Sequence, residues 1–141
     1  RFLNPLHEKK YKVGIIPHVC DLMEVYRNYA NRYNDYRIIN LSDPIEKVVT
    51  EILECEMTIS SALHGMIASH AYGIRCRWVE FSDIVIGKGF KFRDYFTTVD
   101  TYTDPLDLRK FPDLTNIEGE IPTHTITTDL DKLLQACPIK N

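Results

Sequence analysis

Short apolar runs that alternate with stretches of helical periodicity are the feature that most restricts the fold of this chain. The apolar runs are residues 11–17, 36–41, 57–61 and 76–81. The stretches with apolar residues at helical spacing are residues 22–33, 45–53 and 63–72. A short apolar run suits a strand buried on both faces, and regular alternation of strand and helix is the pattern of a parallel sheet. The sequence therefore predicts an α/β fold, with helices on both faces of a parallel, Rossmann-like sheet.

Several residues mark the expected ends of helices. Asp21 is expected to cap the first helix with its side chain, and Ser42-Asp43-Pro44 predicts the start of the second. Gly73 follows the third helix, where a residue of left-handed conformation belongs. The expected core-facing stripe of the first helix consists of Leu22, Tyr26, Tyr29, Ala30 and Tyr33.

The remaining segments define the expected domain organisation. Residues 91–99 predict a short aromatic helix, residues 103–125 contain three prolines and are expected to be mostly extended, and Asp129 is expected to begin a last helix. Residues 1–10 are polar and contain a proline, so we interpret them as a linker from an upstream domain. Residues 11–141 then form one domain of ordinary size.

Composition argues against several classes of protein. The net charge of the 141 residues is -3, so a general affinity for nucleic acid is not expected. No stretch approaches the roughly 18 apolar residues that a membrane span needs. The four cysteines are spread along the chain without a Cys-x-x-Cys pair, which favours reduced thiols in a cytoplasmic protein. His64 and His70 lie about 240° apart around a helix and cannot share a metal ion, so no metal is expected.

The segment of residues 58–65 is the richest in chemically active side chains. Ser60 and Ser61 end a buried strand, and the helix that follows offers free N–H groups and a dipole that favour an anion. We expect the two serines to donate to phosphate oxygens and Gly65 to let a ligand approach the backbone. His64 titrates near neutrality and is the candidate proton donor. The structural alternative is that Ser61 caps the helix and His64 is a core histidine bonded to a carbonyl.

The order of residues in this segment resembles a known signature. Ser-Ser-Ala-Leu-His-Gly at residues 60–65, followed by Ala-Tyr-Gly-Ile at residues 71–74, is similar to the signature of the polysaccharide pyruvyl transferase family. Residues 13–18 resemble the strand that opens the second domain of that family. The Trp-Val-Glu and Gly-Phe-Lys-Phe-Arg-Asp-Tyr-Phe segments resemble the part of the family that comes after the signature, so the resemblance extends from about residue 12 to residue 99.

The resemblance implies a two-domain fold like that of GT-B glycosyltransferases, with this chain as the C-terminal, donor-binding half. It implies phosphoenolpyruvate as the donor substrate, no further cofactor, and a glycan hydroxyl as the acceptor, held by an upstream acceptor-binding domain. The family's signature histidine, which contacts or protonates the donor, corresponds to His64. Two positions depart from the family: Ala62 replaces an arginine suited to paired hydrogen bonds with an anion, and Arg75 replaces a proline.

Four other residues are candidates for donor binding. His18 ends the first strand on the ligand side, and Glu80 ends the fourth strand, where related folds hold a sugar hydroxyl. Lys91 and Arg93 belong to a basic loop that we expect to compensate for the missing arginine. Two alternative functions stay open: a GT-B-type glycosyltransferase domain that binds a nucleotide sugar, and a non-catalytic relative that keeps only the fold.

Overall fold

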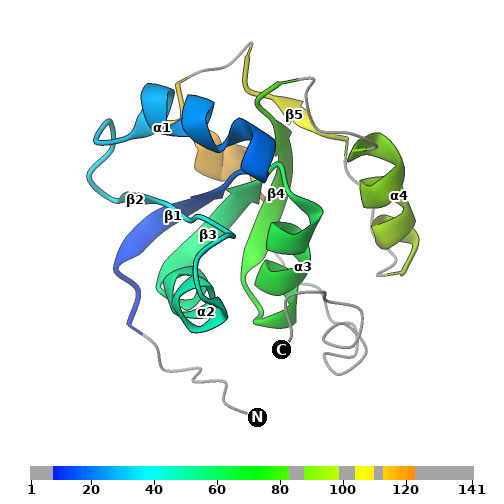
Figure 1. Cartoon of the computed structure of the whole chain (residues 1–141), viewed down its shortest axis with the longest axis horizontal. Coiled ribbons are helices and arrows are strands. Elements are labelled where there is room, and N and C mark those ends of the chain that lie inside the picture. The colour runs from blue at the N-terminus through cyan, green and yellow to red at the C-terminus, as the bar shows by residue number, and fades with distance from the viewer. Residues whose placement is uncertain (1–7, 83–87, 99–103, 110–112, 123–141) are drawn as a thin grey trace.

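The computed structural model describes residues 8–82, 88–98, 104–109 and 113–122. Within these residues the strands form one five-stranded parallel sheet in the order β2-β1-β3-β4-β5 (Figure 1). The strands are β1 Tyr11–Ile16, β2 Tyr36–Ile38, β3 Cys55–Ser60, β4 Arg75–Glu80 and β5 Leu106–Asp107. All four predicted strands are present. The fifth is only two residues long and lies in the proline-containing segment, for which the sequence predicts only extended chain.

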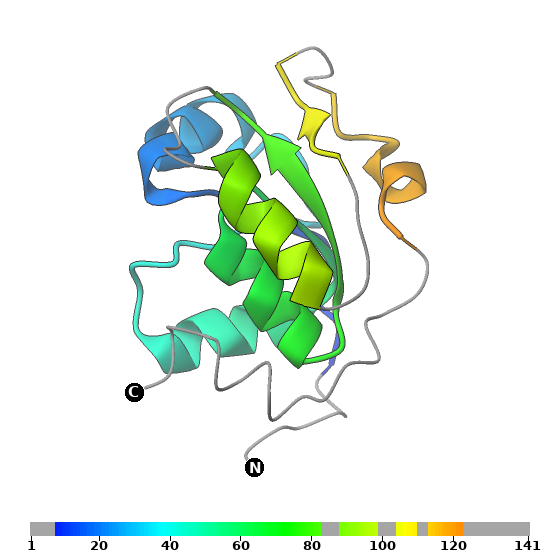
Figure 2. The ribbon, with the colours of Figure 1, turned by 90° about the vertical axis from the view of Figure 1, so that its right-hand side faces the viewer.

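Helices cover both faces of the sheet, as predicted. The helical elements of the described residues are η1 Val19–Asp21, α1 Leu22–Tyr29, α2 Ile45–Leu53, α3 Leu63–Ala71, α4 Lys88–Thr98 and η2 Ile117–Glu120, of which η1 and η2 are 3-10 turns. α1 and η2 pack on one face, and α2, α3 and α4 lie on the other. Figure 2 shows α3 and α4 on one side of β4 and η2 on the opposite side. The expectation of a basic loop is wrong, because Lys91 and Arg93 belong to helix α4.

The alternation of side chains along each strand divides the core in two. Val13 and Ile15 of β1 pack with α1, whereas Ile16 packs with α2 and α3. On β4, Trp78 is buried under α4, and its ring stacks on that of Phe92 with the centroids 4.4 Å apart. Burial of one such aromatic side chain contributes about 2–3 kcal/mol. The apolar residues of α4 therefore hold this helix against the edge of the sheet, with Lys91 on its surface.

Helix α1 differs from the prediction. It ends at Tyr29, and Asn31 shortly after it has a left-handed conformation with a φ of 62°. Its buried residues are Val25 and Tyr29, whereas Tyr26, which the sequence places in the core stripe, is 41% exposed. The capping prediction is also wrong, because the side chain of Asp21 makes no hydrogen bond to the start of α1. The carboxylate of Asp21 instead accepts hydrogen bonds from the side chains of Ser61 and Ser82.

The other helix ends agree better with the prediction. Gly73 follows α3 with a φ of 75°, the left-handed conformation expected there. Ile45 begins α2 directly after Pro44, although no side chain caps this helix. The predicted last helix from Asp129 and residues 1–7 of the predicted linker lie outside the described residues. None of the helices in the described part of the chain has the length and apolar character needed to cross a bilayer.

The connections between strands create a switch point between β1 and β3. These two strands are hydrogen-bonded neighbours, yet α1 leads from β1 to β2 across one face and α3 leads from β3 to β4 across the other. The carboxyl ends of two such strands border the crevice in which open α/β sheets bind ligands. His18 and Ser61 follow these two strand ends. The fold therefore places the segment singled out from the sequence at the position where a ligand site is expected.

Candidate functional site

His18 and Ser61 are bonded to each other at the carboxyl ends of β1 and β3. The backbone N–H of His18 donates to Oγ of Ser61 over 2.9 Å. The N–H of Ser61 donates to the carbonyl of Ile16 over 3.2 Å. Because Ser61 is buried and His18 is half-buried, these bonds are partly shielded from water and are stronger for it. Each loop thus fixes the position of the other.

A buried carboxylate completes this junction. Asp21 is 1% exposed. Its Oδ2 accepts a hydrogen bond from Oγ of Ser61 over 2.9 Å, and its Oδ1 accepts one from Oγ of Ser82. A carboxylate taken out of water needs such donors. Sequence reasoning missed this role and did not single out Ser82, because 40 and 61 residues separate Asp21 from its two partners and no local pattern marks them.

Both signature serines are engaged within the protein. Ser61 uses its single hydroxyl proton on Asp21. Ser60 is fully buried, and its Oγ accepts from the N–H of Ala62 over 3.0 Å and lies 2.9 Å from the carbonyl oxygen of Ile16. These bonds join β1, β3 and the start of α3. Donation to a phosphate would require one of the bonds to break, so that role of Ser60 and Ser61 stays a prediction, whereas their part in fixing the junction is direct.

The start of α3 presents backbone donors. Its N-cap residue, Ala62, makes no side-chain hydrogen bond to the helix, so the prediction that Ser61 caps α3 is wrong. The first N–H groups of a helix, here those of Leu63, His64 and Gly65, have no acceptor within the helix. They form the positive end of the helix dipole. An anion at this end of α3 would meet these donors without displacing a capping side chain.

Close packing explains why residue 65 is a glycine. A Cβ atom on this residue would lie 2.6 Å from Cγ2 of Ile16 and 2.6 Å from Oγ of Ser60. Both distances are far inside van der Waals contact, so any larger residue would push α3 away from β1 and β3. The missing side chain of Gly65 thus faces the sheet. The predicted approach of a ligand to its backbone stays a prediction.

His64 lies at the exposed edge of this site, in the first turn of α3. The interpretation as a core histidine is wrong, because its side chain is exposed. Partial burial of the ring, the ammonium group of Lys91 and the nearby His18 all lower the pKa of His64 below its ordinary value of 6.5. The structure thus brings together three predicted site residues from the β1–α1 connection, α3 and α4. Without a ligand, His64 is predominantly neutral at pH 7.

The ring of His18 is held in one tautomer. Its Nδ1 accepts a hydrogen bond from the backbone N–H of Cys20 over 3.1 Å. When the ring is neutral, its proton must therefore be on Nε2. His18 can offer this Nε2–H as a donor to an anion, in addition to the electrostatic influence that it has on His64.

The other two residues predicted to bind the donor are Arg93 and Glu80. The guanidinium of Arg93 lies 5.6 Å from the ring centroid of Trp78 and 4.0 Å from a carboxylate oxygen of Asp104. Two residues along a helix correspond to about 200°, so Lys91 and Arg93 are on different sides of α4. Glu80 ends β4, where it is the register partner of Asp107 on β5. Donor binding by Arg93 and Glu80 stays a prediction, whereas Lys91 is close enough to His64 to affect its pKa.

The described residues offer no evident metal site. No group of three or more histidine, cysteine, aspartate or glutamate side chains among them is arranged to hold a metal ion. The described cysteines are free, with Cys20 exposed and Cys55 and Cys76 buried. Imidazole, ammonium and backbone N–H groups are the chemically active groups that the described residues bring to this edge of the sheet.

Comparisons with known proteins support the family resemblance seen in the sequence. The model of the polysaccharide pyruvyl transferase family matches residues 1–83. This stretch includes His18, Asp21 and His64, whereas Lys91 and Arg93 lie beyond it. An uncharacterized protein of Acanthamoeba polyphaga mimivirus is 30% identical over 94 residues, which cover 64% of this chain and 32% of that protein. The match thus spans about a third of the length of this curated relative. No solved structure matches the chain significantly.

Proposed function

Because the chain belongs to the polysaccharide pyruvyl transferase family, we propose that it binds phosphoenolpyruvate at the start of α3 for transfer of the pyruvyl group to a sugar hydroxyl. One observation carries this proposal: His64 belongs to the first turn of α3, which has no capping side chain, and His18 and Lys91 are near enough to lower the pKa of His64. This place is also the switch point of the sheet, where related folds bind ligands. A transferase-like domain is what the family match supports, and the donor and acceptor are the proposed part.

The electrostatics of the site suit a small, highly charged anion. Phosphoenolpyruvate carries a phosphate and a carboxylate. The N–H groups at the start of α3 provide donors for one of these groups. Lys91 and the Nε2–H of His18 are available for the other, or for the remaining phosphate oxygens. Ala62, which is 3% exposed, cannot supply the charged hydrogen bonds of the family's arginine. Their loss is expected to weaken donor binding by about 1.5–3 kcal/mol unless Lys91 compensates.

His64 is the proposed source of the proton. When a sugar oxygen bonds to C2 of the donor, the methylene carbon gains a proton and the hydroxyl loses one, which can return to the imidazole. When a second hydroxyl closes the ketal, the phosphate leaves and takes up the proton of that hydroxyl. The pKa of His64 is low in the empty site because of partial burial and Lys91. A bound anion raises that pKa, since it favours the imidazolium. Donor binding would thus charge the acid that the reaction needs.

The surface that orients the reacting sugar is expected to lie outside the described residues. The site lies at the edge of a single sheet, and transfer needs a second surface that orients the sugar and excludes water. We propose that residues 1–141 bind the donor weakly and need an upstream acceptor-binding domain for turnover. Residues 1–141 assayed alone should therefore bind phosphoenolpyruvate and transfer nothing to simple sugars. Measurable turnover by this chain would contradict the need for a second domain.

The test is a titration of the chain with phosphoenolpyruvate, followed by amide chemical shifts. We expect the largest changes at His18, at Leu63 to Gly65 and at Lys91, with His64→Asn weakening the binding and leaving the fold intact. In an intact enzyme this substitution should lower turnover by about 10²–10⁴. Uridine nucleotides are the control. Shifts with these nucleotides only would favour the glycosyltransferase alternative, and no shifts with either ligand would favour a non-catalytic relative.

A further inference from the structure

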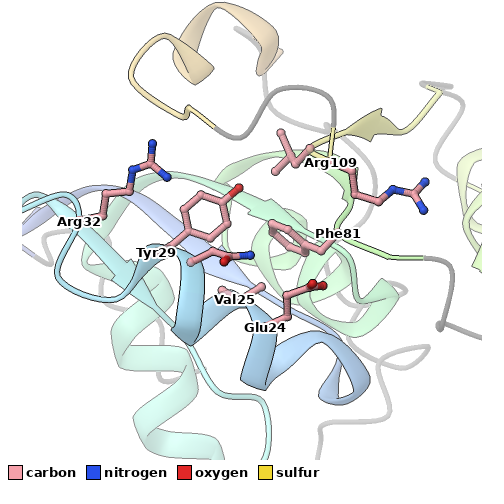
Figure 3. Close-up of a pocket in the computed structure, with 8 residues that line it drawn as sticks. Glu24, Val25, Tyr29, Arg32, Phe81 and Arg109 are labelled. Carbon is pink, nitrogen blue, oxygen red and sulfur yellow. The ribbon is translucent and has the colours of Figure 1, made fainter.

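A recess lies on the opposite face of the sheet from α3. It has a volume of about 330 Å³ and is bordered by α1, the residue after β4 and the segment after β5 (Figure 3). We call it the α1 pocket. Its lining consists of Glu24, Val25, Asn28, Tyr29, Arg32, Phe81, Leu108 and Arg109. The volume is at the lower end of the range for small-molecule sites, which is about 300–1,000 Å³, and it suits one small ring.

The pocket adjoins the Asp21 junction. Val25 is one helical turn from Asp21, a rise of about 6 Å along α1. Phe81 is the chain neighbour of Ser82, which donates to the same carboxylate. The pocket and the α3 site therefore both border the Asp21 junction, from opposite faces of the sheet.

Tyr29 brings an unused hydroxyl to this pocket. The residue is 6% exposed, and among the described residues no hydrogen bond to its hydroxyl is found. Figure 3 shows the hydroxyl pointing away from α1, toward the segment that carries Arg109. Burial raises the pKa of Tyr29, while Arg32 lowers it and Glu24 raises it. The hydroxyl therefore stays protonated at neutral pH and lies near a cation and an anion.

The charges of the lining are balanced once Asp107, which lies beside it, is counted. Arg109 forms a two-pronged pair with Asp107, with its Nε 2.9 Å from Oδ1 and an Nη 3.0 Å from Oδ2. The second arginine, Arg32, and Glu24 carry the remaining charges of the lining, which are opposite in sign. The pocket thus has no excess of positive charge with which to select an anion. It offers a carboxylate, an amide and guanidinium groups around a floor formed by Val25, Phe81 and Leu108, all of which are buried.

The geometry points to a binding site for one neutral sugar residue in the α1 pocket, a subsite for a glycan acceptor next to the donor site. A pyranose ring has hydroxyls that both donate and accept, and it has an apolar C–H face for the floor of the pocket. Glu24, Asn28 and the Tyr29 hydroxyl supply complementary polar partners. The inference rests on the proposed function, since a polysaccharide acceptor extends beyond the sugar that reacts and its neighbouring units need a surface.

The experiment is an amide-shift titration of the chain with glucose, galactose, mannose and N-acetylglucosamine. At least one sugar should give saturable shifts at Glu24, Asn28 and Tyr29, with a Kd on the order of 1–10 mM. Tyr29→Phe should weaken that binding about threefold to tenfold, the effect of one hydrogen bond. The matched control is Tyr26→Phe, which changes an exposed tyrosine of the same helix and should leave the affinity unchanged.

Two further arms separate this inference from the proposed donor site. His64→Asn should weaken the binding of phosphoenolpyruvate and leave sugar binding intact, whereas Asn28→Ala should do the reverse. Sugar shifts at the α1 pocket without any response to phosphoenolpyruvate would overturn the donor site only. Inorganic phosphate binding in the pocket, equal affinity of Tyr29→Phe and the unaltered chain, or no saturable shift with any of the four sugars would each overturn the sugar subsite.

Discussion

Polar side chains at the junction of β3 and α3 are bonded to one another, whereas the Tyr29 hydroxyl of the α1 pocket is not. At the junction, Asp21 receives two serine hydroxyls, and Ser61 also accepts from the backbone of His18. In the pocket, Tyr29 is buried, and its hydroxyl lacks a hydrogen bond to the described residues. Internal bonds make a rigid scaffold, and unused donors and acceptors are what a ligand can satisfy. The junction therefore holds the donor site in place, while the Tyr29 hydroxyl in the pocket is available to bind a ligand.

Removal of the central carboxylate should have the largest effect on the folded state. Asp21→Ala leaves the hydroxyls of Ser61 and Ser82 without their acceptor, so we expect the free energy of unfolding to fall by about 2–4 kcal/mol. Chemical denaturation measures this directly. Asp43→Ala is the matched control, because Asp43 pairs with Lys47 at the surface, and its loss should cost far less. Equal costs for the two substitutions would show that the buried network is not what holds the junction.

A methyl group at the α3–sheet contact should have the next largest effect. Gly65→Ala places a Cβ 2.6 Å from Ile16 and Ser60, and such overpacking costs about 1–3 kcal/mol. Gly119→Ala is the control, since a Cβ on Gly119 would have no atom within 4 Å, and it should change stability by less than about 0.5 kcal/mol. Thermal unfolding of both variants gives the comparison. A stable Gly65→Ala protein would mean that α3 can move away from the strands without cost.

Two tyrosines provide the smallest and most direct contrast. The hydroxyl of Tyr36 donates to the carbonyl of Leu114 over 2.7 Å, so Tyr36→Phe should cost about 1 kcal/mol. The hydroxyl of Tyr29 has no such bond to the described residues, so Tyr29→Phe should leave the free energy of unfolding unchanged or raise it slightly. Both values come from the same denaturation experiment. If Tyr29→Phe were the more destabilising of the two, its hydroxyl would have a structural partner and would not be available to a ligand.

The sequence predicts the fold more fully than the site. Apolar runs and helical spacing are local, so the four longer strands, the presence of helices on both faces and the left-handed Gly73 follow from them. The β5 strand has only two residues and no such signal. On α1, the stripe that begins at Leu22 includes the exposed Tyr26, because the spacing of apolar residues alone does not distinguish it from the buried Val25.

The site depends on contacts between distant parts of the chain. The signature segment indicates where an anion could bind, but the partners of Ser61 are 43 and 40 residues away. An isolated aspartate before a helix resembles a cap, and this local pattern misleads at Asp21. The same limit applies to Lys91 and Arg93, which are close in sequence but lie on different sides of α4. Only the packing of α4 against α3 and Trp78 decides which of the two is near His64.

The most direct test of the account is the pKa of His64, measured from its ring signals by NMR with and without saturating phosphoenolpyruvate. Without the donor, the pKa should lie below 6.5, because of partial burial, Lys91 and His18. With the donor, we expect the pKa to rise, and hence tighter binding as the pH falls through this range. His70 is the internal reference, since burial lowers its pKa to about 4 and its Nδ1 lies 2.7 Å from the Tyr95 hydroxyl, away from the site. A rise at His64 with His70 unchanged is the predicted result, and binding that leaves the pKa of His64 unchanged or lowers it would contradict the account.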